Sequence, residues 1–298
     1  MQYHRSVLLK ESVDALEVFD GGVYVDATFG GGGHSKEILS RVHRCSLFSF
    51  DQDEDAIVND LEDDRLTLIH SNFSDLENSL KLYRVDKVDG VLADLGVSSH
   101  QFDSEERGFS IRFDGPLDMR MGMGIEKTAA DIISDYSFEE ISVMIRSYSD
   151  LKGVGRIAKR IKDVHSYSPI ERTMDLVDVI RELAPPNKHN KFLAQVFQAL
   201  RIEVNNEMQV LKDMLMQTLN ILKPGGVLAV ISYHSIEDRI VKNFMRSGNF
   251  SGEDKKDFFG NSLSPFRVVT KKPIVPSDFE IAENNRARSA KLRIAKIK

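Results

Sequence analysis

Acidic residues and a run of glycines stand at the ends of short apolar segments, where they could bind a ligand. Asp26 closes the first such segment and precedes four consecutive glycines at 30–33, whereas Asp51 and Asp94 close two later segments. If these segments are parallel strands, their carboxyl ends meet at one edge of a sheet. We therefore expect the three carboxylates and the glycines to line one crevice.

The glycine run lies between a predicted strand and a predicted helix. Residues 23–25 are β-branched or aromatic, which suits a buried parallel strand. Beyond the glycines, Ile38, Leu39 and Val42 follow a helical spacing. Without Cβ atoms the backbone can turn sharply and approach a bound molecule, and the helix N-terminus adds free amide groups. A turn without a ligand is the alternative, although four glycines carry a large entropic cost.

The residues around the glycines distinguish between possible ligands. A dinucleotide-binding loop has the pattern Gly-x-Gly-x-x-Gly, which this run lacks, and Asp26 would repel a pyrophosphate. The same carboxylate can bind the ammonium of S-adenosylmethionine. Asp51, about twenty residues past the loop, can accept hydrogen bonds from ribose hydroxyls. Phe73 can flank an adenine ring or pack in the core. This arrangement looks like a class I S-adenosylmethionine methyltransferase.

Composition narrows the classes of protein further. The chain has 298 residues, of which 41% are hydrophobic, enough for a sizeable core. Its single cysteine, Cys45, excludes an intramolecular disulfide and a multi-cysteine metal site and fits a reducing cytoplasm. We find no signal segment and no apolar run long enough to span a bilayer. Because the formal net charge is −6, a nucleic-acid partner must be recognised by local basic patches.

The order of segments predicts one sheet in two parts with an all-helical insert. Apolar spacing is helical throughout 128–183, with no strand candidates. We expect a first sheet part at 1–106, a helical insert with an RNA-facing loop at 107–190, and a second sheet part at 191–298. The remaining expected elements are helix 6–18, strands 46–50, 66–69 and 88–94, helix 191–222, and strands 227–232, 266–269 and 292–297.

Three stretches could contact phosphates. One is the part 107–121 of an irregular segment with several arginines, another is 152–162, with five positive charges and no acid, and the third is a tail that is basic from Arg286 onward. Surface salt bridges and a solvated helix face are the plain alternatives. The substrate-binding candidates are Arg107, Arg112, Asp118, Arg120, Lys159, Arg160, Arg286 and Arg288.

His234 follows the predicted strand 227–232. Ser235 and Asp238 have the spacing of a capping box, although Asp replaces the preferred Glu or Gln. We therefore expect Ser235 to cap the next helix, which leaves His234 without a structural role.

Seven segments together resemble the bacterial ribosomal RNA small subunit methyltransferase H family, also called MraW. They are DATFGGGGHS (26–35), DLGVSS (94–99), RGFS (107–110), GPLDMRM (115–121), FQALRI (197–202), HSIEDR (234–239) and RARSAKLR (286–293). They span nearly the whole chain in the family's order.

The resemblance implies N4-methylation of a cytidine in the decoding region of 16S rRNA, with S-adenosylmethionine as donor. It implies a Rossmann-like methyltransferase domain with an inserted helical domain, no metal, and the small ribosomal subunit as partner in the cytoplasm. The oligomeric state stays open. Our cofactor-binding candidates, from the strand ends and the family's contacts, are Asp26, Gly30, Gly32, Gly33, His34, Asp51, Phe73, Asp94 and Gln101.

The implied acceptor sets a requirement for the catalytic groups. The exocyclic amine of cytosine is a poor nucleophile, so the site must hold its hydrogens with acceptors and align it with the methyl group. The target base must also leave its stack. The catalytic candidates are Asp94, Ser98, Ser99 and His234.

Three other functions stay open. A nicotinamide-dependent oxidoreductase is disfavoured by the missing glycine pattern. A nonenzymatic RNA-binding factor would have lost polar strand-end groups, yet Asp94 and His234 are both present. A methyltransferase acting on DNA or protein is the third; DNA amino-methyltransferases usually carry Pro-Pro and an aromatic residue where this chain has Leu95, Gly96 and Val97.

Overall fold

The computed structural model describes residues 6–122 and 124–298, which form two compact units. The sheet unit comprises Met1–Gly96 and Met208–Lys298, and the helical unit comprises Val97–Glu207. The sequence placed the insert at 107–190, so the helical unit begins earlier and ends later than that range. Among the described residues, no helix is long and apolar enough to cross a membrane.

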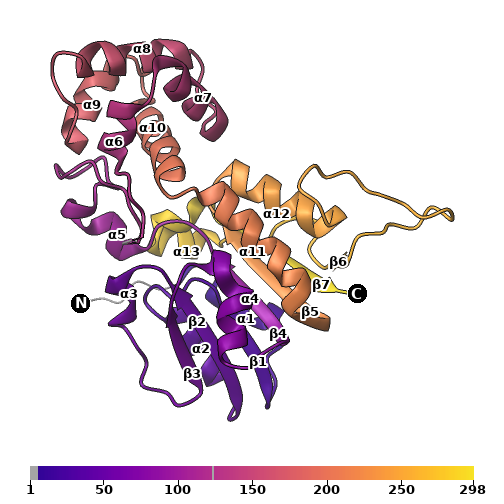
Figure 1. The fold of residues 1–298 in the computed structure, drawn as a ribbon. Coiled ribbons are helices and arrows are strands. Elements are labelled where there is room, and N and C mark those ends of the chain that lie inside the picture. The colour runs from indigo at the N-terminus through magenta and orange to yellow at the C-terminus, as the bar shows by residue number, and fades with distance from the viewer. Residues whose placement is uncertain (1–5, 123) are drawn as a thin grey trace. The chain divides into compact units, whose positions relative to one another are not determined.

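The sheet unit is built on seven strands in the order β3-β2-β1-β4-β5-β7-β6 (Figure 1). Strands β1 to β5 pair in parallel, whereas β7 runs antiparallel to both β5 and β6. The strand order reverses between β1 and β4, and ligands bind at such a switch point, outside the carboxyl ends of the strands. The strands are β1 (Gly22–Asp26), β2 (Cys45–Asp51), β3 (Leu66–His70), β4 (Val88–Asp94), β5 (Leu222–Ser232), β6 (Phe266–Val268) and β7 (Lys291–Ile297).

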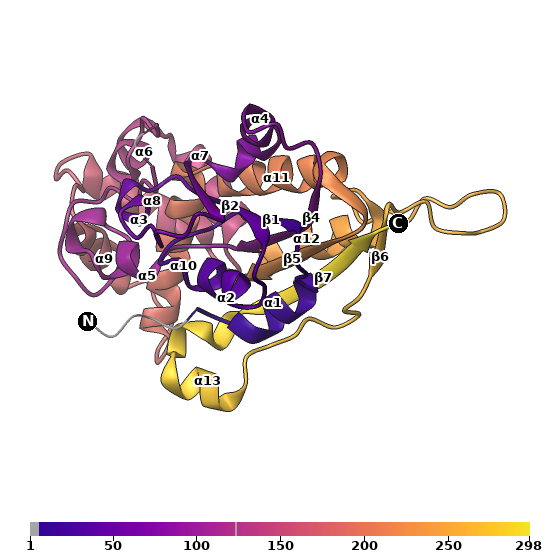
Figure 2. The same ribbon diagram turned by 90° about the horizontal axis from the view of Figure 1, so that it is seen from below.

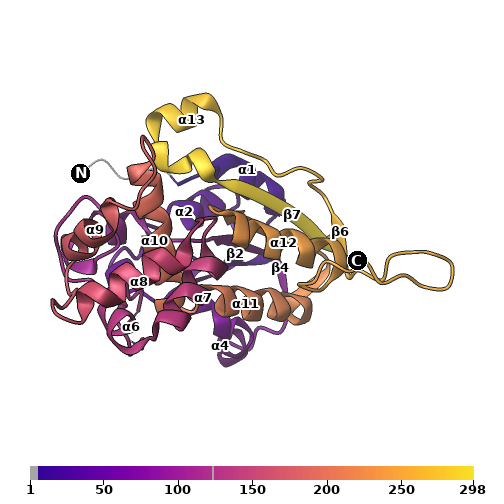
Figure 3. The same cartoon turned by 90° about the horizontal axis from the view of Figure 1, so that it is seen from above.

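Helices cover both faces of this sheet. Figure 2 and Figure 3 show α4 and α11 on one side of the strands and α1 and α2 on the other. Each face has its own apolar core: α12 shares the α4 and α11 side, and α1 and α2 share theirs with the segment after α13. These helices are α1 (Leu9–Leu16), α2 (Gly33–Ser40), α3 (Glu54–Ile57), α4 (Leu76–Leu82), α11 (Glu207–Ile221), α12 (Ser235–Ser247) and α13 (Asp278–Glu283).

The helical unit has a separate apolar core. Its buried residues come from the irregular segment 109–121 and from α6 to α10. The 107–121 loop is therefore partly core: Phe109, Leu117 and Met119 are each less than 5% exposed. The helices are α5 (Ser99–Asp103), α6 (Ala129–Asp135), α7 (Phe138–Tyr148), α8 (Val154–His165), α9 (Thr173–Arg181) and α10 (His189–Val204).

The expectation of one helix over 191–222 is wrong. The helix breaks into α10 and α11 at Asn205 and Asn206, and Asn206 has a φ of 47°. Asn tolerates this left-handed conformation better than most residues. The Asn205 side chain is buried; it accepts a hydrogen bond from the Met121 amide (2.8 Å) and donates one to the Met119 carbonyl (2.7 Å). These contacts to a distant segment hold the break.

The predicted strands are confirmed with small changes in their bounds. The segment 223–226, expected to end a helix, instead lies inside β5, which begins at Leu222. The N-terminal helix is shorter than 6–18, because Leu8 and Glu17 at its ends have left-handed φ values of 50° and 51°. The expected helical character of 128–183 is confirmed by α6 to α9.

Candidate cofactor site

The glycine loop follows β1, leads into α2, and is hydrogen-bonded to the carboxyl end of β2. The amide of Gly30 donates a hydrogen bond to Asp51 Oδ2 at 2.7 Å, so the loop is fastened to the acid at the end of β2. Gly30 and Gly32 have φ values of +53° and +72°, which L side chains rarely adopt. The glycines are therefore needed for the shape of the loop as well as for open space beside it.

Asp26 holds this loop from beneath. Its side chain has no exposed surface; Oδ2 accepts a hydrogen bond from Ser35 Oγ (2.7 Å) in α2, and Oδ1 accepts one from the Thr28 amide (3.1 Å). The hydroxyl of Ser35 also bonds with that of Ser49 in β2 (2.8 Å). In this geometry, Asp26 shapes the loop and the start of α2 rather than facing a ligand directly.

Asp51 is positioned as an acceptor at the carboxyl end of β2. Burial raises the pKa of its carboxyl, while hydrogen bonds from the amides of Asp53 and Gly30 lower it in part. The Asp53 amide lies 2.9 Å from Oδ1. Each carboxylate oxygen can accept two hydrogen bonds, so lone pairs remain for ligand hydroxyls.

Phe73 lies in the 3₁₀ turn η1 (Phe73–Asp75) that follows β3. It is half-buried and packs partly against the core on the α4 side. The preceding Asn72 donates a hydrogen bond to Gln52 Oε1 at 2.6 Å, which holds the turns after β2 and β3 together. The turn that begins with Phe73 is therefore tied to the residue directly after Asp51.

Asp94 forms the centre of a polar cluster at the carboxyl end of β4. Its Oδ1 accepts a hydrogen bond from the Tyr233 hydroxyl at 2.8 Å, and its Oδ2 lies 4.0 Å from His34 Nδ1. The Asp94 amide donates to Thr28 Oγ1 at 2.7 Å, so the ends of β1 and β4 are tied together. Burial raises the pKa of Asp94 to about 6, although His34 and the Tyr233 hydroxyl both act to lower it.

His34 is held in place within this cluster. Its side chain is 4% exposed, and Nε2 lies 3.2 Å from the carbonyl oxygen of Val7. The neighbouring Gly33 could not carry a side chain without moving Ser6, whose Oγ would lie 2.1 Å from the new Cβ. The segment before α1 thus packs directly on the glycine loop.

His234 has a structural role that the sequence did not predict. It is His234, rather than Ser235, that caps α12: His234 Nδ1 accepts from the Glu237 amide at 3.4 Å, and Glu237 Oε2 accepts from the His234 amide at 3.3 Å. The expected Ser235–Asp238 box is wrong because Asp238 instead pairs with Arg293. His234 Nε2 lies 3.1 Å from Glu237 Oε1 but has no hydrogen-bond partner among the described residues.

Sequence reasoning missed Tyr233 and Glu237. Tyr233 supplies the hydroxyl that contacts Asp94, and Glu237 Oε2 accepts from the Tyr233 amide at 2.9 Å. Burial, together with the Asp94 charge, raises the pKa of Tyr233 well above its usual value. The signal was a tyrosine directly after a buried strand, since a buried phenol requires a polar partner.

Three predicted site residues belong to the start of α5 in the helical unit. Ser98 Oγ accepts from the Gln101 amide at 3.1 Å, and Gln101 Oε1 accepts from the Ser98 amide at 3.1 Å, which makes a capping box. Ser99 is the first residue of the helix. Their roles toward cofactor and substrate stay predictions.

Several basic candidates are braced by local partners. Arg120 grips Asp118 with two hydrogen bonds of 2.8 Å, and Arg107 donates to the Arg120 carbonyl at 3.2 Å. Lys159 pairs with Asp163 at 2.8 Å on the exposed side of α8. The Arg120–Asp118 contact is a surface salt bridge of the kind that the sequence left open as an alternative, and Lys159 lies on a solvated helix face. The other substrate-binding candidates, half-buried or exposed, are Arg112, Arg160, Arg286 and Arg288.

The loop and the carboxylates at the carboxyl edge of the sheet fit S-adenosylmethionine. The glycine loop leaves room beside the backbone, Asp51 offers free lone pairs toward ribose hydroxyls, and the Asp94 cluster supplies negative charge. The strand order and this edge together define a class I S-adenosylmethionine-dependent methyltransferase with a Rossmann-like sheet.

Comparison with known proteins specifies the family. A sequence model described as the MraW methylase family matches residues 1–298, and the chain belongs to that family. Two relatives, both named ribosomal RNA small subunit methyltransferase H, come from Christiangramia forsetii (54% identical) and Flavobacterium johnsoniae (51% identical). Each alignment covers 99% of this chain and 98% of the relative.

The sheet is also similar to that of solved methyltransferases. One is a putative methyltransferase from Streptococcus mutans in complex with SAH, which is 14% identical with a TM-score of 0.40. The alignment covers 99% of this chain and 100% of that one. A similarity of this size adds nothing to the functional assignment, which stands on the family.

Proposed function

We propose that this protein transfers a methyl group from S-adenosylmethionine to N4 of a cytidine in the decoding region of 16S rRNA. The observation that supports the proposal most strongly is full-length membership in a family whose curated relatives, at 50–54% identity, are named as small-subunit rRNA methyltransferases. The small ribosomal subunit is the proposed partner. The polar groups that an enzyme would need are present at the strand ends.

The cofactor would be held by groups from successive strand ends. S-adenosylmethionine supplies a methyl group on a positively charged sulfur. In our proposal, Asp51 accepts hydrogen bonds from the ribose hydroxyls, and the ring of Phe73 flanks the adenine. The loop at 30–33 lies against the methionine portion, with Asp26 keeping the loop in shape through Ser35 and Thr28.

Asp94 would act on both cofactor and acceptor. Methyl transfer is an in-line displacement, so the acceptor amine must be aligned and its hydrogens held. An ionised carboxylate accepts such hydrogen bonds well, and a pKa of about 6 keeps Asp94 mostly ionised at neutral pH while making it a stronger base than an ordinary carboxylate. Tyr233 fixes its orientation through the 2.8 Å hydrogen bond.

His234 completes the acceptor site that we propose for the sheet unit. Because His234 Nδ1 accepts from the Glu237 amide, the neutral ring carries its proton on the buried Nε2, which lies 3.1 Å from Glu237 Oε1 and would offer a donor rather than an acceptor to the base. Ser98 and Ser99 stay sequence predictions, at the start of α5 in the helical unit. A cytidine has to be turned out of its stack to meet these groups. Basic residues of the protein would assist this step by holding the RNA backbone.

The direct test is methyl transfer to small ribosomal subunits that lack this modification. The full-length protein is incubated with labelled S-adenosylmethionine and the rRNA nucleosides are separated. We expect label in N4-methylcytidine, at least about a hundredfold less with Asp94→Asn, and unchanged label with Asp14→Asn, a carboxylate exposed on α1.

Two results would overturn parts of the proposal. Cofactor binding with label only in DNA or protein acceptors would remove the rRNA substrate and keep the methyltransferase. Cofactor binding with no label in any acceptor would favour the nonenzymatic RNA-binding alternative. Isothermal titration with the cofactor distinguishes both results from a protein that has lost its fold.

A further inference from the structure

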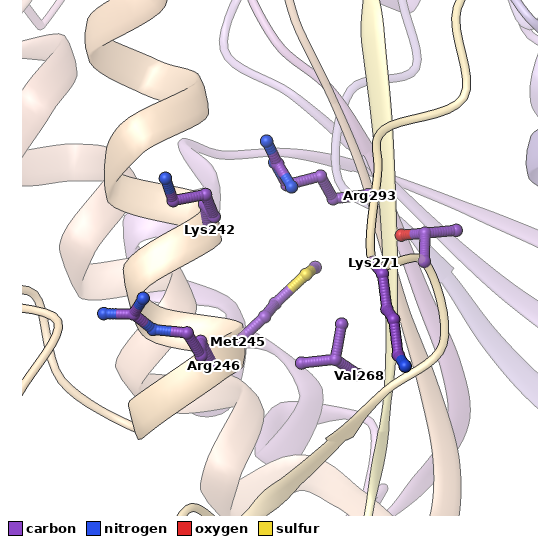
Figure 4. Close-up of a pocket in the computed structure, with 7 residues that line it drawn as sticks. Lys242, Met245, Arg246, Val268, Lys271 and Arg293 are labelled. Carbon is purple, nitrogen blue, oxygen red and sulfur yellow. The ribbon is translucent and has the colours of Figure 1, made fainter. Parts of the chain in front are cut away.

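A basic cavity lies at the edge of the sheet, on the face covered by α12. Its volume is about 340 Å³, and Figure 4 shows α12 on one side and the β6–β7 edge on the other. It is lined by Lys242, Met245, Arg246, Val268, Thr270, Lys271 and Arg293. None of these residues belongs to the cofactor site or to the predicted substrate-binding residues.

The lining is mainly apolar, with cations at its rim. Lys242 and Arg246 stand one turn apart on α12 with their charged ends directed away from the middle of the cavity, and Lys271 stands on the opposite side, in the chain after β6 (Figure 4). Met245 and Val268 lie between these cations. Within the described residues, no carboxylate lines the cavity. The cavity can therefore receive an apolar group that carries negative charge at its edges.

The partners of the four cations show which charges are available. The charge of Arg293 is neutralised, because Arg293 donates hydrogen bonds of 2.6 and 3.2 Å to the Asp238 carboxylate. Arg246 donates to the carbonyl oxygen of Gly252, which leaves its charge without a carboxylate. Lys242 and Lys271 are exposed, and neither forms an ion pair with any residue in the described part of the chain. Three positive charges are thus uncompensated around one cavity.

We propose that this cavity binds one nucleotide of the substrate RNA outside the methylated cytidine. The two phosphates that flank it in the chain would lie at Lys242 and Arg246 on one rim and at Lys271 on the other, and its base or ribose against Met245 and Val268. The inference rests on the proposed rRNA substrate. RNA is commonly recognised through splayed nucleotides that combine phosphate contacts with packing of the base. The volume lies within the range of about 300–1,000 Å³ typical of sites for small organic groups.

The charge of the whole chain makes such a local site necessary. With a net charge of −6, the protein as a whole repels a polyanion, so RNA affinity must come from places where cations gather without acids. Lys159, Arg120 and Arg293 each pair with a carboxylate and therefore contribute less to RNA affinity. The cavity at α12 is a site where unpaired cations from two separate segments surround one apolar hollow.

The test is the salt dependence of RNA binding by the Lys242→Ala/Lys271→Ala variant. A fluorescein-labelled single-stranded RNA of the decoding region is titrated with the full-length protein at KCl concentrations from 50 to 200 mM. Each phosphate contact to a single strand contributes about 0.7 to the slope of log Kd against log salt. We expect the slope to fall by about 1.4 and binding at 50 mM salt to weaken about tenfold.

Matched variants separate this effect from a change in fold or in overall charge. Lys10→Ala/Lys87→Ala removes the same charge from exposed positions of the sheet unit and should leave the slope unchanged. Lys242→Arg/Lys271→Arg keeps the charges and should restore the wild-type slope. Cofactor affinity and thermal melting should be equal in all of these proteins, because none of the lysines touches the strand ends described above.

Three outcomes would overturn the inference. A wild-type slope for Lys242→Ala/Lys271→Ala would show that no phosphate binds here. Equal loss with the Lys10→Ala/Lys87→Ala control would mean that only net charge matters. Displacement by an acidic peptide or by cytidine monophosphate, without a change in RNA slope, would assign the cavity to a protein or a free nucleotide. A reduced slope in a protein that labels no cytidine would instead refute the proposed methylation and keep the RNA site.

Discussion

The carboxyl edge of the sheet and helix α8 both carry many charges, but they hold them differently. At the sheet edge, Asp26 has no exposed surface and Asp94 is fixed by Tyr233. On α8, the Lys159 side chain is 69% exposed and pairs with a neighbour one turn away. Burial makes the first set of charges interdependent, whereas solvent screens the second set. Substitutions should therefore have large, coupled effects at the edge and small, additive ones on α8.

The largest effect is expected from Asp94→Asn. The amide cannot accept hydrogen bonds as an ionised carboxylate does, so the acceptor amine loses its alignment and its base. We expect the single-turnover rate of methyl transfer to fall at least about a hundredfold. Activity within threefold of wild type, with a normal melting temperature, would show that Asp94 does not touch the acceptor and that the coupled cluster is only structural.

Asp26→Ala tests the buried support of the glycine loop. The change leaves the Ser35 hydroxyl and the Thr28 amide without this acceptor, and hydrogen bonds to a charged group contribute about 1.5–3 kcal/mol each. We expect the free energy of unfolding to fall by about 3–6 kcal/mol in urea titrations, and cofactor affinity to fall with it. Asp14→Ala, at an exposed site on α1, should stay within about 0.5 kcal/mol of wild type. Equal losses for the two variants would contradict the assigned role.

The residues at the carboxyl edge could be predicted from the sequence as far as the strands of the sheet could be recognised. The strands were recognisable because buried parallel strands read as apolar runs, and their carboxyl ends converge wherever the sheet forms. That is why Asp51 and Asp94 could be selected before any contact was known. The contact of Asp94 with Tyr233 could not be predicted, because it depends on the register between β4 and β5, in which Asp94 pairs with Ile231.

The misjudged elements share a physical cause. The break between α10 and α11 leaves the helical spacing of apolar residues almost intact, and it is held by Asn205 contacts to Met119 and Met121, far away in the sequence. At the start of α12 the extended capping residue is His234 rather than Ser235, because Asp238, the expected partner of Ser235, pairs with Arg293 instead. The cavity beside α12 also needs three separate elements. Local patterns do not report such long-range partners.

Tyr233→Phe tests the buried Asp94 cluster through the pH dependence of the methyl-transfer rate. Burial raises the pKa of Asp94 to about 6, so methyl transfer should increase as the pH rises through 6 and the carboxyl loses its proton. The Tyr233 hydroxyl acts to lower this pKa, and its removal should move the rising limb of the pH–rate profile to higher pH. The rate on the alkaline plateau should fall less than in Asp94→Asn. An unmoved limb would show that Asp94 does not control the profile.

Removing exposed charges from α8 should give the smallest effect. Lys159→Ala/Arg160→Ala removes two cations that, if they touch RNA, each contribute about 0.7 to the salt slope. Because Lys159 already pairs with Asp163, we expect RNA affinity to weaken less than threefold at physiological salt, with cofactor affinity and the pH–rate profile unchanged. The same anisotropy titration used for the cavity measures this. A loss as large as that expected for Lys242→Ala/Lys271→Ala would overturn the contrast, because α8 would then hold RNA as a built site rather than as a screened surface.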